Sequence, residues 1–327
     1  METPVQEHIL PDRNSARRTA SRCAFAAVVA LAIAQTLMTL YTVLTRNLAL
    51  KEQLASDLEL IANTVVVDLI AMPLSWLLFL RRIPKDPVWE SEGTERTPLR
   101  VPTLLFFFPC VYALAVAGSV LGRIAGLLGG KLVDPATEAV LAVDPWVTLL
   151  CAVILAPTAE ELFFRKALID RLSVYHPMDA ILLSALLFGL IHGNLTQFLY
   201  AFPIGVLFGI IYWRTKNIRY TILLHMGMNT LGGLLPQLAQ LLTTAGETDE
   251  IAAILGTFVT LLLGLLTIGL VVVGVIFLIR YRRRFLPIES DLPRVRKPFY
   301  LNAGFIVACI VFIGLFVFTE ILSRVSF

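Results

Sequence analysis

Long blocks of apolar residues with almost no charge constrain this chain more than any other feature. Each is of the order of the ~20 residues that a helix needs to cross the hydrocarbon core of a bilayer. The blocks lie at 23–45, 58–80, 101–122, 146–159, 220–238, 253–279 and 300–319. A longer block, 178–213, has room for two shorter helices around a break near Gly193–Asn194. Only 16% of the residues are charged, against about 25% in soluble domains. We therefore predict an all-α, polytopic transmembrane bundle of about eight or nine membrane helices.

The positions of the basic residues predict how the bundle is oriented. With nine alternating helices and a cytoplasmic N-terminus, the inward segments would be 1–22, 81–100, 165–176, 214–219 and 280–297. These segments hold 22 of the 27 Lys and Arg residues, or 21 if Arg165 is counted as part of a helix. That asymmetry follows the positive-inside rule and predicts an integral membrane protein with its N-terminus in the cytoplasm. We interpret the basic cluster 280–284 as an anchor to anionic lipid of the bilayer, and we expect no nucleic acid partner.

Three places break the apolar pattern with polar side chains. Charged residues at mid-membrane cost ~2.5–3.5 kcal/mol, which makes them functional candidates. The first place holds Glu160, Glu161 and Arg165. Adjacent carboxylates point about 100° apart around a helix, and the i, i+4 spacing of Glu161 and Arg165 suits an ion pair. Glu160 is then free to face another partner, unless the helix simply ends here with both acids in water.

The second place is Phe188 followed by His192, and the third is His225 followed by Asn229. The i, i+4 spacing puts the imidazole of His225 and the carboxamide of Asn229 on one helix face. The alternative interpretation is structural. His192 would then be a core histidine bonded to a carbonyl, and the third pair would be a polar contact between membrane helices.

The helix spacing predicts that these places meet. A hairpin turning near Tyr175–Pro177 puts Glu160 and His192 each roughly 22–24 Å from the turn, at about 1.5 Å per residue. A second turn near Lys216–Asn217 places His225 about 13 Å in, which is the same depth if the first hairpin protrudes ~10 Å further into the cytoplasm. One Glu, two His and one Asn can therefore converge, nearer the cytoplasmic side.

Such a cluster allows two chemistries for peptide hydrolysis. In one, Glu160 and His192 supply a general base for water while His225 and Asn229 donate hydrogen bonds to the oxyanion. In the other, Glu160, His192 and His225 form a His₂Glu zinc set, which would make the protein a metalloprotease. The chain has no membrane GxSxG, no paired intramembrane aspartates and no HExxH, so serine, aspartyl and zincin mechanisms lack their residues. Both remaining chemistries stay open.

The ordered motifs EExxxR, FxxxH and HxxxN resemble the CPBP family of intramembrane proteases. This family includes the type II CAAX prenyl endopeptidases and the bacterial Abi proteins. The resemblance implies that Glu160 and His192 activate water and that His225 and Asn229 bind the oxyanion. It also implies that Glu161 and Arg165 support them and that Phe188 lines the site. It covers about residues 145–240, which defines four parts of the chain. These are a cytoplasmic N-terminal segment 1–22, N-terminal membrane helices 23–144, a CPBP-like catalytic core 145–240 and C-terminal membrane helices 241–327.

We predict an intramembrane endopeptidase that cuts a membrane-anchored protein or peptide, in a bacterial plasma membrane. No cofactor is required by this prediction, and zinc is the alternative. A non-catalytic immunity or regulatory scaffold of the same family is the second hypothesis. A transporter is a weaker third one, because the chain shows no obvious inverted repeat.

Overall fold

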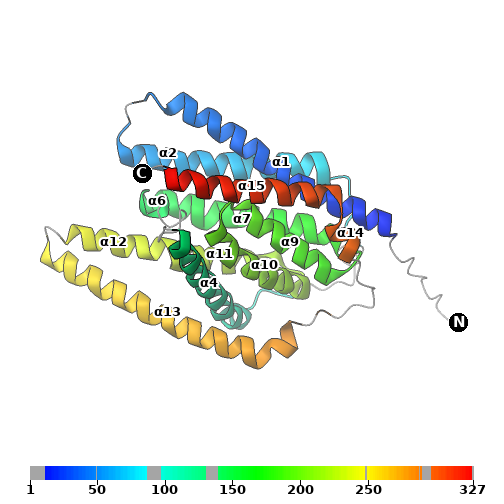
Figure 1. The fold of residues 1–327 in the computed structure, drawn as a ribbon. Helices are drawn as coiled ribbons and strands as arrows, with labels where there is room; N and C mark the ends of the chain where they lie inside the picture. The colour runs from blue at the N-terminus through cyan, green and yellow to red at the C-terminus, as the bar shows by residue number, and fades with distance from the viewer. Residues whose placement is uncertain are drawn as a thin grey trace.

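The computed structural model is a bundle of long helices, with no strand among the residues that it describes. Those residues are 12–48, 50–86, 97–129, 139–246, 249–286, 288 and 296–325. Figure 1 shows α1 (Arg13–Thr45), α2 (Glu52–Thr64) and α15 (Ala303–Val325) along one side of the bundle. The helices α12 (Leu235–Ala245) and α13 (Glu250–Phe285) lie along the opposite side.

The remaining helices lie between these two sides. Helix α2 continues through η1 (Val65–Ala71), α3 (Met72–Ser75) and η2 (Trp76–Leu80), where η denotes a π-helical segment. α4 (Val101–Gly129) packs against α10 and α13. The next long helix joins α6 (Pro145–Val147), η4 (Thr148–Leu155), α7 (Ala156–Glu160), η5 (Glu161–Ile169) and α8 (Asp170–Leu172). After it come α9 (Pro177–Ile191), α10 (Leu195–Thr215), α11 (Ile218–Asn229) with η6 (Thr230–Leu234), and the short α14 (Arg296–Tyr300).

Six of the described helices are long and apolar enough to cross a bilayer, and two shorter apolar helices accompany them. The six include α13. In its most apolar stretch of 18 residues, only 6% is buried inside the protein. A helix that is apolar all round and exposed belongs against lipid. The prediction of a polytopic helical membrane bundle is therefore confirmed.

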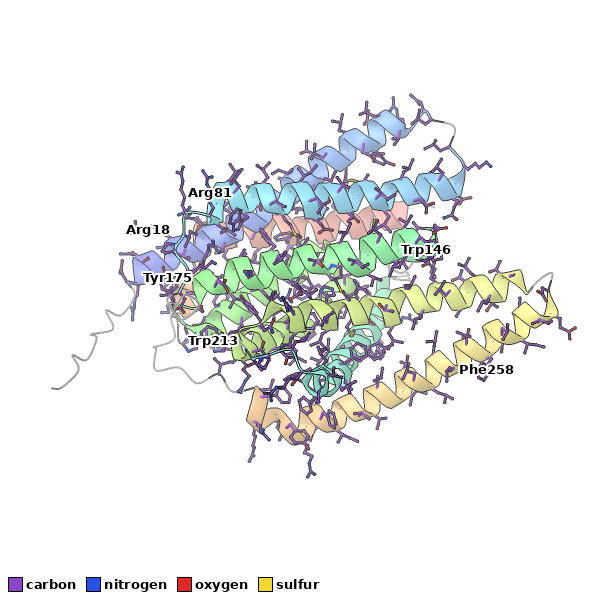
Figure 2. All side chains as sticks on the ribbon, turned by 180° about the vertical axis from the view of Figure 1, so that it is seen from behind. Arg18, Arg81, Trp146, Tyr175, Trp213 and Phe258 are labelled. Carbon is purple, nitrogen blue, oxygen red and sulfur yellow. The ribbon has the colours of Figure 1, made fainter. Side chains whose placement is uncertain are left out.

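The predicted N-terminal segment 1–22 divides into two parts. Residues 1–11 lie outside the described residues, whereas the remainder belongs to α1, which begins at Arg13. Of the predicted linker 81–100, residues 87–96 also lie outside the described residues. In Figure 2, Arg18, Arg81, Tyr175 and Trp213 lie at one end of the bundle and Trp146 at the other. Described residues in or next to four of the five basic segments that were expected to share a side therefore lie at one end of the bundle.

The predicted break in the block 178–213 is confirmed, and the local sequence explains it. α9 ends at Ile191, and Gly193 then takes a left-handed backbone with φ 68°. Glycine adopts that conformation without steric cost. Asn194 starts α10 by accepting a hydrogen bond from the backbone N–H of Gln197 at 2.8 Å, as N-cap residues do. His192 thus sits at the very end of α9.

Three of the π-helical segments end two residues before a proline. The pairs are η1 with Pro73, η4 with Pro157, and η6 with Pro236. Proline has no N–H and its ring pushes away the carbonyl four residues earlier. A wider turn before the proline accommodates this clash inside a membrane helix.

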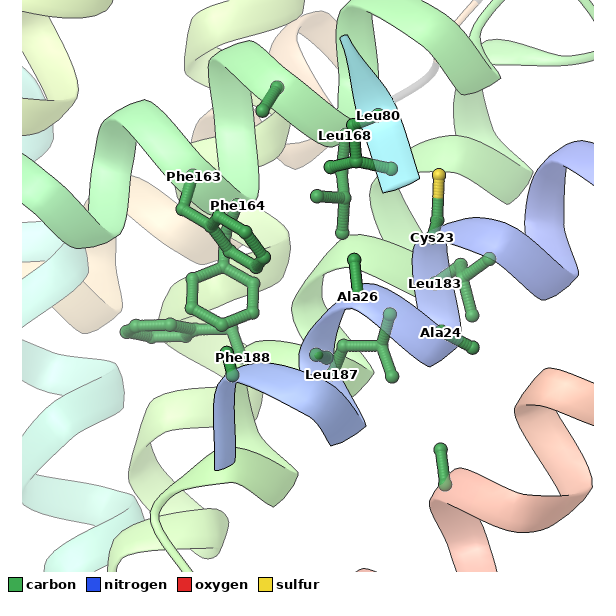
Figure 3. Close-up of a cluster of buried hydrophobic side chains, with 14 of the residues drawn as sticks. Cys23, Ala24, Ala26, Leu80, Phe163, Phe164, Leu168, Leu183, Leu187 and Phe188 are labelled. Carbon is green, nitrogen blue, oxygen red and sulfur yellow. The ribbon is translucent and has the colours of Figure 1, made fainter. Parts of the chain in front are cut away.

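Small side chains of α1 let the bundle close tightly around its core. The helix buries a face that is mostly alanine, including Ala20, Ala24 and Ala27. Figure 3 shows Cys23 and Ala24 of α1 beside Leu183 of α9. The same buried cluster includes Phe164, Leu168 and Phe188, so the core reaches the helices that carry the sequence motifs.

Gly118 lets α4 lie directly on α10. A Cβ at Gly118 would come within 2.5 Å of the Leu199 carbonyl oxygen and of the Tyr200 Cα, both in the backbone of α10. We expect Gly118→Ala to lower the free energy of unfolding by about 1–3 kcal/mol, because the two helices must move apart. The midpoint of thermal denaturation in detergent measures this. Gly264→Ala is the control, since nothing lies within 4 Å of its added Cβ; equal midpoints for the two variants would contradict the packing argument.

Candidate active site

The long helix Pro145–Leu172 carries two adjacent glutamates with different surroundings. Glu160 ends α7, and its side chain keeps 18% of its surface exposed. Glu161 begins η5 and its side chain is fully buried. The two carboxylates therefore point in different directions, as the helix geometry predicts.

Glu161 and Arg165 form the ion pair that their spacing predicts. The Arg165 Nη1 lies 3.0 Å from the Glu161 Oε1, and both side chains have no exposed surface. The guanidinium also lies 4.2 Å from the ring centroid of Phe188 and 5.4 Å from that of Phe208. Arginine is attracted to the faces of aromatic rings. A buried charge needs compensation of this kind, because its removal from water is costly.

His225 on α11 lies between the two glutamates. Its Nδ1 is 3.1 Å from the Glu161 Oε1, and its Nε2 is 3.6 Å from the Glu160 Oε2. Glu161 therefore contacts both Arg165 and His225 through one oxygen. A carboxylate on one imidazole nitrogen fixes the ring and decides how the other nitrogen can act. Glu161 thus aims the Nε2 of His225 at Glu160.

His192 is oriented by the carbonyl of a residue one turn earlier. Its Nδ1 lies 2.8 Å from the Phe188 carbonyl oxygen. A carbonyl oxygen only accepts hydrogen bonds, so Nδ1 carries the hydrogen and Nε2 of the neutral ring is an acceptor. The ring of Phe188 packs edge-on against His192 and against His225, which places one aromatic side chain between the two imidazoles.

The predicted polar residues face one cavity of about 640 Å³. Its lining includes Glu160, Phe188, His192, His225 and Asn229. The Nδ2 of Asn229 donates a hydrogen bond to the Ala152 carbonyl oxygen at 2.8 Å. An amide nitrogen has two hydrogens, so one remains for the cavity. The structure therefore brings together the residues that the three motifs single out, and it places Glu160 next to His225.

The cavity extends from Glu160 toward the end of the bundle that carries Trp146 (Figure 2). On the long helix it is lined by Thr148, Ala152 and Ala156, which stand one turn apart on a single face leading to Glu160. The sequence predicted a site nearer the basic end of the bundle. Glu160 and His225 form the floor of the cavity, which runs away from that end.

Asp68 is a cavity residue that the sequence analysis missed. It lies on η1, which packs against α7, and it lines the cavity while only 5% exposed. It is close enough to Glu160 for their charges to interact. The expectation that only three places break the apolar pattern is therefore wrong. The signal was present, because Asp68 is the sole charged residue between Glu59 and Leu80, and ionisable residues within membrane spans are functional candidates by default.

The residues do not assemble the alternative zinc site. Within the described part of the chain, no three His, Cys, Asp or Glu side chains lie close enough together to hold a metal ion. The expected set of Glu160, His192 and His225 is thus not arranged as a His₂Glu centre.

Comparison with known proteins supports a peptidase family. Residues 142–231 match the family described as type II CAAX prenyl endopeptidase Rce1-like. The chain is 30% identical over 171 residues to the "Putative membrane peptidase YdiL" of Bacillus subtilis (strain 168), covering 50% of this chain and 68% of the relative. It is 31% identical over 128 residues to the "UPF0177 protein YbdI" of Lactococcus lactis subsp. lactis (strain IL1403), covering 36% and 69%. No solved structure matches the chain. The chain therefore belongs to the Rce1-like CPBP family, which its three motifs resemble.

Proposed function

We propose that this protein is an intramembrane endopeptidase that hydrolyses a peptide bond in a membrane-anchored protein or peptide, with Glu160 as the base. The observation that carries the proposal is the position of His225, held by Glu161 at 3.1 Å and facing Glu160 at 3.6 Å across the cavity floor. Family membership supports the reaction class. The shared cavity supports the assignment of residues.

In the first step, a water molecule binds between Glu160 and the histidines. A polar separation slightly above 3.5 Å is one that water can bridge, which suits the gap between Glu160 and His225. The Glu160 carboxylate removes a proton from the water. The Nε2 of His192 accepts the water's second hydrogen bond. The oxygen then forms a bond to the carbonyl carbon, and the carbonyl π electrons move to its oxygen.

In the second step, the resulting oxyanion accepts hydrogen bonds from His225 and from the free N–H of Asn229. Loss of one such donor typically costs about 3–4 kcal/mol of transition-state stabilisation. The oxyanion collapses, the carbon–nitrogen bond breaks, and Glu160 returns its proton to the leaving amine. The products are a carboxyl terminus and an amino terminus, so the step balances without a further reactant.

We also propose that the protein lies in a bacterial plasma membrane with its N-terminus in the cytoplasm. Both relatives are bacterial, and the basic residues gather at the end of the bundle where α1 begins. In this orientation the cavity extends toward the outer face of the membrane. The scissile bond would then be reached from that side.

Glu160→Gln should reduce peptide hydrolysis by roughly 10²–10⁴-fold, since an amide cannot accept the proton of water. The protein should stay folded, because Glu160 is not part of the Arg165 ion pair. Hydrolysis of membrane-anchored peptides in proteoliposomes measures the effect. Glu59→Gln, on the exposed surface of α2, is the control and should keep full activity. A fully active Glu160→Gln variant would contradict the assignment of Glu160 as the base and favour the scaffold hypothesis.

Glu161→Gln should behave differently and destabilise the fold by about 3–5 kcal/mol, because it leaves Arg165 buried without its counter-charge. Thermal denaturation in detergent measures the loss. The double variant Glu161→Gln with Arg165→Met should recover part of it, since the uncompensated charge is then gone. If Glu161→Gln alone melts like the wild type, the ion pair has no structural importance.

Cysteine labelling should report the side from which the cavity is reached. We expect Gln240→Cys, in the cavity lining, to react with a membrane-impermeant maleimide added to intact cells. Arg81→Cys, at the opposite end, should react only after the membrane is opened. Wild-type protein treated with the same maleimide gives the background labelling of the native cysteines. The reverse pattern would overturn the orientation and leave the peptidase proposal standing.

A further inference from the structure

The cavity lining has an unbalanced charge. It contains two carboxylates, Asp68 and Glu160, and within the described residues it contains no Lys or Arg. Arg165 does not contribute, because it is fully buried beside Glu161. The proposed mechanism uses Glu160 as the base and gives no role to Asp68.

One carboxylate oxygen of Asp68 has no hydrogen-bond partner in the part of the chain that the structure describes. Its Oδ1 is buried and has no hydrogen-bond partner among the described residues, and its side chain is only 5% exposed. A buried carboxylate that is neither paired nor hydrogen-bonded is costly to keep. Asp68 belongs to the cavity lining, so a ligand in the cavity can supply the missing partner.

The surroundings of Asp68 suit a side chain with an apolar stem and a charged tip. Val67 and Met72 lie beside it on the same helix, and Leu31 and Ala34 of α1 line the same cavity. Lysine and arginine cover apolar surface with their methylene groups and place the charge at the end. An acidic group in this position would meet the like charges of Asp68 and Glu160.

We propose that Asp68 selects substrates with a Lys or Arg side chain next to the scissile bond, by accepting hydrogen bonds from its cationic end. The inference rests on the proposed function, in which Glu160 is the base. Asp68 lies near that base, because η1 packs against the helix turn that ends at Glu160. A side chain bound at Asp68 then belongs to a residue close to the bond that is attacked by the water held at Glu160. Asp68 acts in recognition and takes no part in proton transfer.

The first experiment measures cleavage preference. Wild-type protein in proteoliposomes is given a positional library of palmitoylated peptides, and mass spectrometry identifies the cuts. We expect Lys or Arg at one fixed position beside the cut to be preferred at least tenfold over norleucine. Asp68→Asn should reduce this preference to about twofold, because cleavage of the Lys and Arg peptides falls much more than cleavage of the norleucine peptides. Asp68→Glu should keep part of the preference, and Glu59→Gln on the same long helix should keep all of it.

The second experiment measures binding without turnover. Glu160→Gln is titrated with two fluorescent palmitoylated peptides that differ only in Lys against norleucine at the selected position, or at each position in turn if no cut is seen. We expect at least tenfold tighter binding of the lysine peptide, and loss of that difference when Asp68→Asn is added. Absence of cleavage with this binding difference intact would contradict the proposed function but not the recognition site.

Three results would overturn the inference. One is equal cleavage and equal binding of lysine and norleucine peptides by protein with Asp68 intact. Another is a lysine preference that survives in Asp68→Asn. The third is an equal loss of activity on all peptides in Asp68→Asn, which would assign Asp68 to proton transfer or to folding.

Discussion

The rest of the site depends on the contacts that the Glu161 carboxylate makes with Arg165 and His225. One of its oxygens contacts both the buried guanidinium of Arg165 and the imidazole of His225. In an apolar environment neither charge of the ion pair is tolerated alone, so the pair holds η5 in one rotation. That rotation sends Glu161 inward and leaves Glu160 at the cavity surface. The two adjacent acids therefore have different positions: Glu161 holds the imidazole of His225, and Glu160 faces the cavity.

The prolines explain how straight membrane helices can enclose a cavity at all. The widened turns of η1, η4 and η6 each precede a proline, and each contributes residues to the cavity lining, such as Asp68, Thr148 and Gly232. A π turn holds one residue more than an α turn and so shifts which side chains face inward. The π turns that accommodate the prolines thus also determine which side chains line the cavity.

Much of this arrangement could be predicted from the sequence because the bilayer imposes simple rules. The apolar blocks give the helices, and the turn at Gly193–Asn194 follows from a glycine and a capping residue. Helix spacing brings Glu160, His192 and His225 together. Which of them touch could not be predicted, because this depends on helix rotation. The π turns change that rotation by amounts that a regular 3.6-residue period does not contain, so the contact of Glu160 with His225 appears only in the structure.

Asp68 shows the second limit of the sequence argument. It stands alone in an apolar block, whereas the other site residues occur in motifs of two or three. The matching family region, residues 142–231, holds the proposed chemistry, and Asp68 lies outside it on a helix that only the fold brings into contact with α7. The structure thus separates two parts of the site. The proposed catalytic residues lie in the three motifs of the family region, while another wall of the cavity comes from α1 and η1. The second part can vary while the first is kept, because specificity is a difference between affinities and can be set by a single wall of the cavity.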